Sequence, residues 1–277
     1  MKLPFTKMHG LGNDFVVFDF TQVRIPLSAE QATMIADRHL GVGCDQILII
    51  EQSDRADVDF KYRILNADGS EVGQCGNGSR CFALYVREHG LSDKNPITVE
   101  TITGDMVLDL NADSSFVTVT MPIPEFKPAQ VPLDFTQRQE TYQLTINNQN
   151  IEFSALSVGN PHAVIQVPET QTADVESLGP ILESHAAFPE RANIGFMQII
   201  NRQEFSLRVY ERGVGETIAC GSGACAAAVA GIQSGKLDNS VTAHLTGGDL
   251  QISWAGEGHP IMMTGPAVSV FDGIIEL

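Results

Sequence analysis

The chain has 277 residues, of which 43% are hydrophobic and 18% are charged, so it can bury one large core or two modest ones. Its formal net charge of −17 argues against a nucleic-acid partner, because binding to phosphates requires a basic face. We expect a solvated acidic surface instead.

No apolar run in the sequence approaches the ~18 residues that a membrane-spanning helix needs. The N-terminal stretch MKLPFTKMHGLGNDF lacks the continuous hydrophobic core of a signal peptide, because polar residues and glycines interrupt it. We therefore expect a cytoplasmic protein without a membrane partner, whose cysteines are reduced thiols rather than a disulfide framework. The five cysteines are Cys44, Cys75, Cys81, Cys220 and Cys225.

Three helices are predicted from capping signals and apolar spacing. The first covers about residues 29–38, where Ser28 and Gln31 form a capping box. The second covers about residues 78–87, with apolar residues at helical spacing and Gly90 as a stop signal. The third is CGSGACAAAVAGIQSG, which is so rich in alanine that we expect it to be largely buried.

Most of the remaining chain predicts short strands of alternating polarity, such as ITVETI, FVTVTM, YQLTI and LQISW. Residues 122–135 carry four prolines, which exclude a regular helix or a central strand, and we interpret this stretch as a linker. Domains are then expected at residues 1–121 and 136–267. Residues 268–277 are expected to return to the first domain as a strand.

The two halves of the sequence resemble each other, which is the observation that organises the rest. Segment 59–66 (DFKYRILN) aligns with segment 204–211 (EFSLRVYE), and the same offset pairs Cys75 with Cys220. An earlier Gly-Asn pair also recurs, within LGNDFVVFDF and VGNPHAVIQV. Each half therefore has a Gly-Asn turn, strands, and a loop that ends in Cys-Gly-[Asn/Ser]-Gly before a helix.

Two equivalent cysteines at the starts of two helices suggest acid–base chemistry. Unpaired N–H groups and the helix dipole favour the thiolate there, and the same N–H groups can hold a substrate carboxylate. If the halves face each other, one thiolate can remove an α-proton while the opposite thiol delivers a proton to the other face. The arrangement suits inversion of a carbon centre, provided that the site stabilises the developing carbanion.

Other roles for the cysteines and glycines are weaker. Cys81 and Cys225 fall inside predicted helices and fit small core residues, and Cys44 fits a structural role. No pair of cysteines has the C-x2-C spacing of a metal site, so we expect no metal. The Gly-x-Gly pairs lack the third glycine and the strand–helix context of a dinucleotide site.

Taken together, these motifs resemble those of the diaminopimelate epimerase family. The matching stretches are KMHGLGNDFVVFD, GVGCDQILII, NADGSEVGQCGNGSRC, VGNPHAV, ANIGF and RVYERGVGETIACGSGACA. The resemblance implies an α+β fold of two pseudo-symmetric domains, each a β-barrel-like mixed or antiparallel sheet around a central helix. It also implies an isomerase that needs no cofactor and interconverts LL- and meso-2,6-diaminopimelate, in lysine and peptidoglycan-precursor synthesis.

The resemblance also implies roles for individual residues. Cys75 and Cys220 match the acid–base pair, and His162 and Glu211 match positions thought to tune the pKa values of the cysteines. Arg212 suits a carboxylate, which its guanidinium can hold with two parallel hydrogen bonds. The implied substrate-binding residues are Asn13, Gln46, Asn66, Gly76, Asn77, Asn160, Asn193, Glu211, Arg212, Gly221 and Ser222. A homodimer is implied as well, and we expect Phe271 to form part of its contact.

Some of these residues also have structural interpretations. Considered alone, His162 fits a structural histidine whose hydrogen bonds are satisfied within the fold. What favours a functional role is its place in GNPH, the counterpart in the second half of the first Gly-Asn motif. An asparagine in a Gly-rich loop often serves turn geometry alone. Glu211 aligns with Asn66, so the repeat is broken there, and a carboxylate in one half can bias which thiol is ionised.

Two alternative functions remain open at this point. The chain could belong to a related epimerase or isomerase that acts on another α-amino acid or a cyclic intermediate, although the proline racemase type has different surrounding motifs. The phenazine-isomerase type lacks the cysteine pair. A redox-sensing binding protein, in which Cys75 and Cys220 form a reversible disulfide, is the alternative from another class.

Overall fold

The computed structural model describes residues 1–73, 75–112 and 116–277. Gln74, in the first cysteine loop, and residues 113–115 lie outside the described part. The chain divides into two compact units. Unit 1 comprises Met1–Thr120 and Thr264–Leu277, and unit 2 comprises Met121–Met263.

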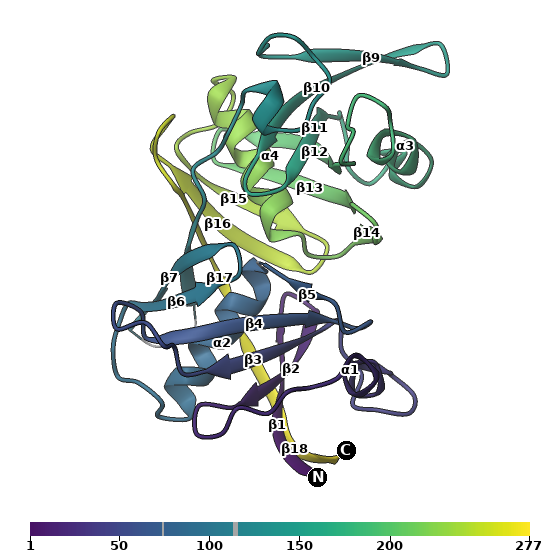
Figure 1. Ribbon diagram of the computed structural model, residues 1–277. Helices are drawn as coiled ribbons and strands as arrows, with labels where there is room; N and C mark the ends of the chain where they lie inside the picture. The colour runs from purple at the N-terminus through teal and green to yellow at the C-terminus, as the bar shows by residue number, and fades with distance from the viewer. Residues whose placement is uncertain (74, 113–115) are drawn as a thin grey trace. The chain divides into compact units, whose positions relative to one another are not determined.

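Unit 1 is a mixed sheet wrapped around one helix, α2, with a second helix, α1, on its outside (Figure 1). Antiparallel ladders join β1 to β2, β3 to β4 and β6 to β7, whereas β2–β3 and β4–β6 are parallel. Its elements are β1 (Lys2–Gly10), β2 (Asn13–Asp19), α1 (Ala29–Ala36), β3 (Gln46–Glu51), β4 (Phe60–Asn66), β5 (Glu71–Val72), α2 (Gly76–Glu88), β6 (Ile97–Thr101), β7 (Gly104–Leu110), β8 (Phe116–Met121) and β18 (Val268–Glu276).

Unit 2 repeats this order of pairings around its own central helix, α4. The parallel pairs β11–β12 and β13–β15 correspond to β2–β3 and β4–β6, with antiparallel ladders between them. Its elements are η1 (Pro128–Gln130), β9 (Tyr142–Ile146), β10 (Gln149–Ser157), β11 (Pro161–Gln166), α3 (Val175–Glu183), β12 (Asn193–Asn201), β13 (Glu204–Glu211), β14 (Gly215–Thr217), α4 (Gly221–Gln233), β15 (Ser240–Leu245) and β16 (Gly248–Trp254). Strand β17 (Ile261–Pro266) begins in unit 2 and ends in unit 1.

The predicted helices are confirmed, with small differences at their ends. The capping box of α1 is present: Ser28 Oγ accepts from the Gln31 N–H, and the Gln31 side chain accepts from the Ser28 N–H. Helix α1 ends at Ala36, two residues before the predicted end. Helix α4 is buried along almost all of its length, as its alanines predict, because small side chains let strands approach it closely.

Helix α3 was not predicted from the sequence, because Gly179 and Pro180 interrupt its pattern. A Cβ atom on Gly179 would lie 2.7 Å from the ring of Tyr210 on β13. The glycine therefore allows close packing of helix against strand.

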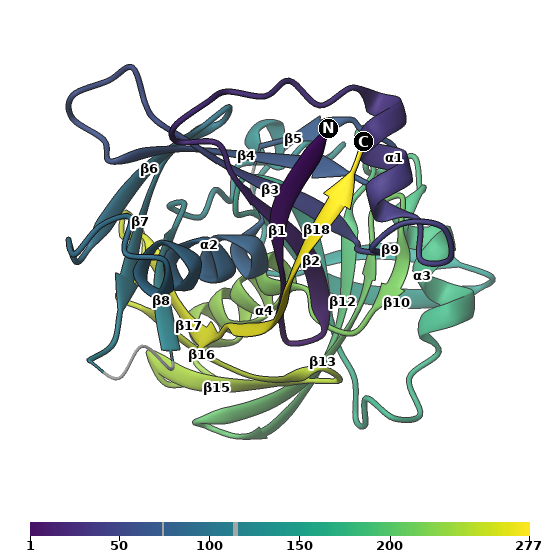
Figure 2. The same cartoon turned by 90° about the horizontal axis from the view of Figure 1, so that it is seen from below.

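The C-terminal strand β18 lies beside β1 in an antiparallel ladder from Lys2↔Glu276 to His9↔Val268, and the two termini lie together (Figure 2). The Leu277 N–H donates to the Met1 carbonyl at 2.8 Å. Residues 122–135 lie in unit 2, where Val131 and Leu133 belong to a buried apolar cluster.

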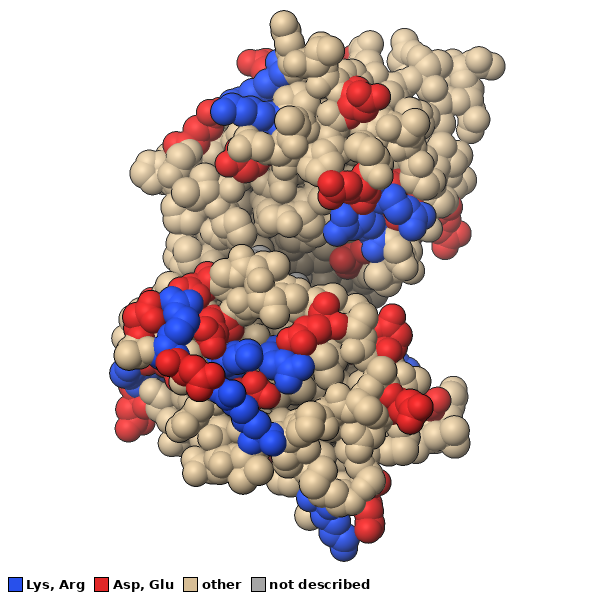
Figure 3. Space-filling model, in the orientation of Figure 1, with Lys and Arg blue, Asp and Glu red and all other residues tan. Residues whose placement is uncertain are grey.

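Acidic and basic side chains lie close together on the face of each unit drawn in Figure 3. On unit 1, for example, Arg55 forms ion pairs with Asp57 and Asp105. Among the described residues, no helix is both long and apolar enough to cross a bilayer.

Candidate active site

Cys75 is the N-cap of helix α2. Its backbone is extended, with φ −146° and ψ 107°, and its Sγ atom accepts a hydrogen bond from the Gly78 N–H at 3.4 Å. The first N–H groups of a helix have no partner within the helix, so a thiolate placed here is stabilised by them and by the helix dipole. The prediction that Cys75 lies at the start of a helix is confirmed.

The side chain of Asn13 is held in one orientation beside Cys75. Its amide nitrogen donates to the Asp45 carboxylate at 2.8 Å, and a carboxylate can only accept. Its oxygen therefore points the other way, where it lies 3.7 Å from Cys75 Sγ and accepts from the Asn77 amide at 3.2 Å. This oxygen is placed to accept a hydrogen bond from the Cys75 thiol.

A cluster of charges anchors this arrangement, and the sequence analysis missed it. Asp14 accepts from Lys7 at 2.5 Å and from both terminal nitrogens of Arg38, and Arg38 also reaches Asp45 at 2.7 Å. Burial opposes ionisation of Asp14, but the hydrogen bonds from Arg38 and Lys7 outweigh it and hold its pKa well below the usual range. The cluster keeps Asp45 where it orients Asn13.

Arg80 forms hydrogen bonds that hold the cysteine loop of unit 1, and the sequence did not predict this role. It is fully buried at 0% exposure, and its guanidinium donates to the Gly76 carbonyl at 3.2 Å, to Asn77 Oδ1 at 2.9 Å and to the Pro266 carbonyl at 3.0 Å. Five donors in a rigid plane suit this bridging of several oxygens. The motif NGSRC contains this arginine, but nothing in it predicts burial.

Gln46 and Asn66 form a second polar pair in unit 1. They are register partners at the ends of β3 and β4, and the Gln46 amide donates to Asn66 Oδ1 at 2.9 Å. The Asn66 amide in turn donates to Ser70 Oγ at 3.0 Å. Both predicted side chains are half-buried at one edge of the sheet.

Cys220 occupies the same position in unit 2, as the N-cap of α4, with φ −100° and ψ 100°. Its thiol is only 4% exposed and lies 3.7 Å from Ser222 Oγ. Burial raises the pKa of Cys220 well above its usual value, and the negative charge of Glu211 raises it further. Hydrogen bonds from Gly223 and Ser222 act in the opposite direction.

His162 and Asn160 connect the second Gly-Asn motif to this cysteine loop. His162 is 1% exposed, and its Nε2 lies 3.0 Å from Asn160 Oδ1; the Asn160 amide reaches Ser222 Oγ at 3.4 Å. Burial and the positive charge of Arg212 lower the pKa of His162 to about 3. The imidazole is therefore neutral near pH 7.

Asn193 is the first residue of β12, and Arg212 directly follows the last residue of β13. The Asn193 amide donates to the Pro161 carbonyl at 3.2 Å, and its oxygen accepts from the Arg212 N–H at 3.0 Å. The Arg212 guanidinium donates to the Glu190 carbonyl at 3.0 Å. Glu211, the residue before it, accepts from the Thr217 hydroxyl.

In unit 1 the structure joins Asn13, Cys75 and Asn77 in one group and Gln46 with Asn66 in a second. In unit 2 hydrogen bonds join Asn160 to His162 and Ser222, and Asn193 to Arg212. Phe271 lies outside these groups: it is 50% exposed on β18, with its ring 6.0 Å from that of Phe5. In the described part of the chain, no group of three or more His, Cys, Asp or Glu side chains could hold a metal ion.

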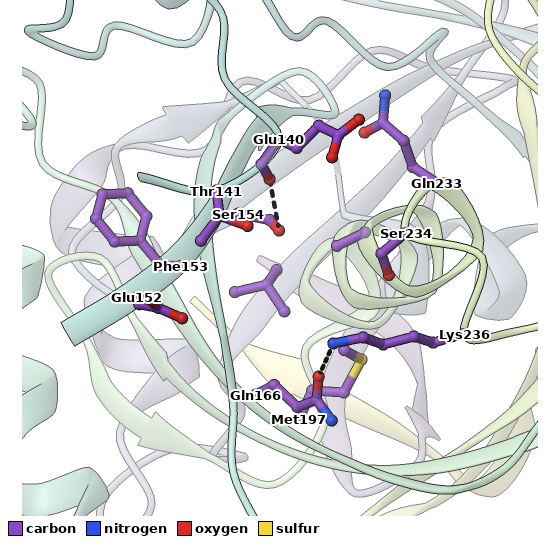
Figure 4. A pocket seen from close by; sticks show the side chains of 12 residues that line it. Glu140, Thr141, Glu152, Phe153, Ser154, Gln166, Met197, Gln233, Ser234 and Lys236 are labelled. Atoms are coloured by element: carbon purple, nitrogen blue, oxygen red, sulfur yellow. Dashed lines mark hydrogen bonds between the residues drawn. The ribbon is translucent and has the colours of Figure 1, made fainter. Parts of the chain in front are cut away.

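A cavity of about 220 Å³ in unit 2 lies elsewhere (Figure 4). Glu140, Ser154, Gln233 and Lys236 are among the residues that line it. Gln233 is the last residue of α4, whereas Cys220 precedes the first. The 13 residues of α4 separate the two by roughly 20 Å, at about 1.5 Å per residue. This cavity therefore does not belong to the thiol chemistry.

Comparison with known proteins decides the family. The sequence profile described as diaminopimelate epimerase matches residues 5–127 and 154–270. A diaminopimelate epimerase of Nitrosospira multiformis is 55% identical over 100% of this chain and 99% of its own, and one of Teredinibacter turnerae is 53% identical over the whole of both chains. The chain belongs to the diaminopimelate epimerase family.

Membership of this family makes the chain an isomerase of the epimerase class. Solved structures support the fold. A hydroxyproline epimerase from Agrobacterium vitis has a TM-score of 0.72 at 16% identity, covering 99% of this chain and 92% of its own. A phenazine biosynthesis protein of the PhzF family from Bacillus anthracis has a TM-score of 0.71 at 16% identity, covering both chains completely. The predicted α+β fold is confirmed.

Proposed function

We propose that this chain interconverts LL- and meso-2,6-diaminopimelate with Cys75 and Cys220 as its two acid–base groups. The observation that carries the proposal is that Cys75 and Cys220 are the N-cap residues of equivalent helices. Asn13 of the first Gly-Asn motif contacts Cys75, and Asn160 of the second contacts Ser222 in the loop of Cys220. The reaction would belong to lysine and peptidoglycan-precursor synthesis in the cytoplasm.

In the proposed reaction, one thiolate takes the α-proton and leaves a carbanion, and the opposite thiol gives its proton to the other face of the same carbon. The backbone N–H groups at the starts of α2 and α4, from Gly76, Asn77, Gly221 and Ser222, stabilise the negative charge that develops. One proton is taken and one is given, so the step needs no oxidant or reductant. We propose that the two thiols and these N–H groups carry it without an organic cofactor.

The polar residues of the candidate site are proposed to hold a substrate with two ammonium and two carboxylate groups. Arg212 would bind a carboxylate as a bidentate cation. Neutral amides suit the remaining contacts, because they can donate to carboxylates or accept from ammonium groups. The residues assigned to these contacts are the amides Asn13, Gln46, Asn66, Asn160 and Asn193, together with the carboxylate of Glu211.

The test is turnover of LL-diaminopimelate by the purified reduced protein, with a chelator present and pyridoxal phosphate absent. We expect conversion to the meso form, and a loss of at least about a thousandfold in kcat for Cys75→Ala and for Cys220→Ala, since each removes one proton-transfer group. Undiminished turnover in either variant would refute the assignment. A redox sensor would show no conversion even when fully reduced.

We also propose that the chain forms a homodimer through β18, on which Val270, Phe271 and Ile274 are exposed. Exposed apolar residues that gather on one element commonly mark protein contacts. Phe271→Glu should convert the dimer into a monomer in sedimentation experiments. Phe116→Glu, at another exposed aromatic residue of unit 1, is the matched control and should leave the assembly unchanged.

A further inference from the structure

Glu183, the last residue of α3, has a buried carboxylate that the proposed reaction does not use. The residue is 2% exposed. One carboxylate oxygen accepts from the Gly213 N–H at 2.9 Å, and the other pairs with the Arg191 guanidinium at 2.8 Å. Because an ionised carboxylate is costly to bury without partners, both contacts are needed to keep it there.

The first of these contacts lies in the turn that carries two candidate site residues. Residues 211–214 join β13 to β14, and the Val214 N–H donates to the Glu211 carbonyl at 3.1 Å. Gly213 has φ +74°, a left-handed conformation that glycine adopts without strain. The Glu183 carboxylate therefore binds the middle of this turn, one residue after Arg212.

Glu183 also contacts the segment that leads into β12. Its own carbonyl accepts from the Ala192 N–H at 3.2 Å, and Asn193 follows directly. Asn193 in turn accepts from the Arg212 backbone N–H at 3.0 Å. One residue thus links both chain segments that carry Asn193 and Arg212.

Unit 1 holds its equivalent turn in another way. The offset that pairs Gln46 with Asn193 in the repeat also pairs Ala36 with Glu183. Unit 1 therefore has an alanine at the position where unit 2 has the Glu183 carboxylate. Instead, Gly69 packs directly on α1, where an added Cβ would lie 2.5 Å from Ala29 Cα. The turn of unit 1 lies against α1 and carries hydrogen bonds among Asn66, Asp68 and Ser70, whereas a carboxylate from α3 binds the turn of unit 2.

We propose that Glu183 is a positioning residue for substrate binding in unit 2. By binding the Gly213 N–H, it fixes the turn from which Arg212 reaches a substrate carboxylate. This inference rests on the proposed function. It predicts that loss of the carboxylate weakens substrate binding more than it slows the chemical step.

Three variants test the proposal. Glu183→Ala removes both contacts, Glu183→Gln keeps an oxygen that can accept from Gly213, and Asp238→Ala is a control. Asp238 pairs with Arg202 at 2.8 Å, beside the hairpin at the other end of β12 and β13. Each variant is assayed for KM and kcat with diaminopimelate, for thermal stability, and for hydrogen–deuterium exchange in the peptide that covers residues 205–217.

We expect Glu183→Ala to raise KM about tenfold and to leave kcat within about threefold, because the Gly213 N–H loses its acceptor and the turn that carries Arg212 is no longer held. Exchange in the peptide should become faster. Glu183→Gln should stay within about twofold of the wild type in KM, and Asp238→Ala should change neither KM nor this exchange.

Unchanged exchange in Glu183→Ala would overturn the anchoring of the turn. Faster exchange with an unchanged KM, or equal effects of all three variants on stability alone, would overturn the positioning role. If the wild type does not epimerise diaminopimelate, the proposed function fails by itself, and the exchange measurement still decides whether Glu183 holds the turn.

Discussion

At the residue scale, the two thiols have surroundings of different charge. Cys75 lies beside the neutral Asn13, whereas Cys220 is buried near the carboxylate of Glu211. His162 occupies the register position that Phe15 occupies in unit 1. The repeat thus preserves the thiols but changes the side chains around them.

Replacing Glu211 by Gln should lower the pKa of Cys220, because it removes a negative charge that raises this pKa. The rate of alkylation by iodoacetamide, measured against pH in a Cys75→Ala background, should reach its midpoint at a lower pH. The exposed carboxylate of Glu176 provides a control, and Glu176→Gln should leave the midpoint unchanged. A midpoint that stays or rises in Glu211→Gln would contradict this account. When both cysteines are present, Glu211→Gln should also change kcat in the LL-to-meso direction and kcat in the reverse direction by different factors.

His162 should make folding stability depend on pH. Its pKa in the folded state is about 3, below the 6.5 of an ordinary histidine, so between these values the unfolded chain binds a proton that the folded chain does not. Stability is therefore lost as pH falls through 6.5 toward 3. His162→Phe should reduce the slope by up to about 1.4 kcal/mol per pH unit in this window, measured by urea unfolding. The exposed His259→Asn variant should keep the wild-type slope.

At the scale of elements, the central helices approach the strands so closely that glycine is required. A Cβ atom on Gly78 of α2 would lie 2.4 Å from the Tyr62 hydroxyl and 3.0 Å from Leu48 Cδ2. The Tyr62 hydroxyl is buried and has no hydrogen-bond partner among the described residues. The closeness of Tyr62 therefore explains the second glycine of the loop CGNG.

Gly78→Ala should destabilise the fold by about 1–3 kcal/mol, as overpacking does in a tight core. Tyr62→Phe alone should cost little, since the hydroxyl makes no hydrogen bond that would be lost. Combining the two changes should recover part of the loss, because the clash with the hydroxyl is removed. Chemical denaturation of the single and double variants measures this coupling. Strictly additive effects would show that Tyr62 is not the obstacle.

At the scale of the whole molecule, the internal repeat allowed much of the fold to be predicted. The Cys-Gly loops located the starts of α2 and α4, because helix starts have local signals. The charged cluster of Asp14 and Arg38, the buried Arg80 and the anchor at Glu183 were not predicted. Their partners lie far away in the sequence, and no local pattern marks a side chain that will be buried by distant segments.

The central claim is that two separate thiols serve the two faces of one stereocentre. The most direct measurement is conversion of LL-diaminopimelate in D2O, with deuterium at the α-carbon followed by mass spectrometry at low conversion. The account predicts one deuterium in the meso product and none in recovered substrate, because the donor thiol has exchanged with solvent while the base has not returned its proton. Deuterium accumulating equally in recovered substrate, or a product without it, would contradict the two-thiol mechanism.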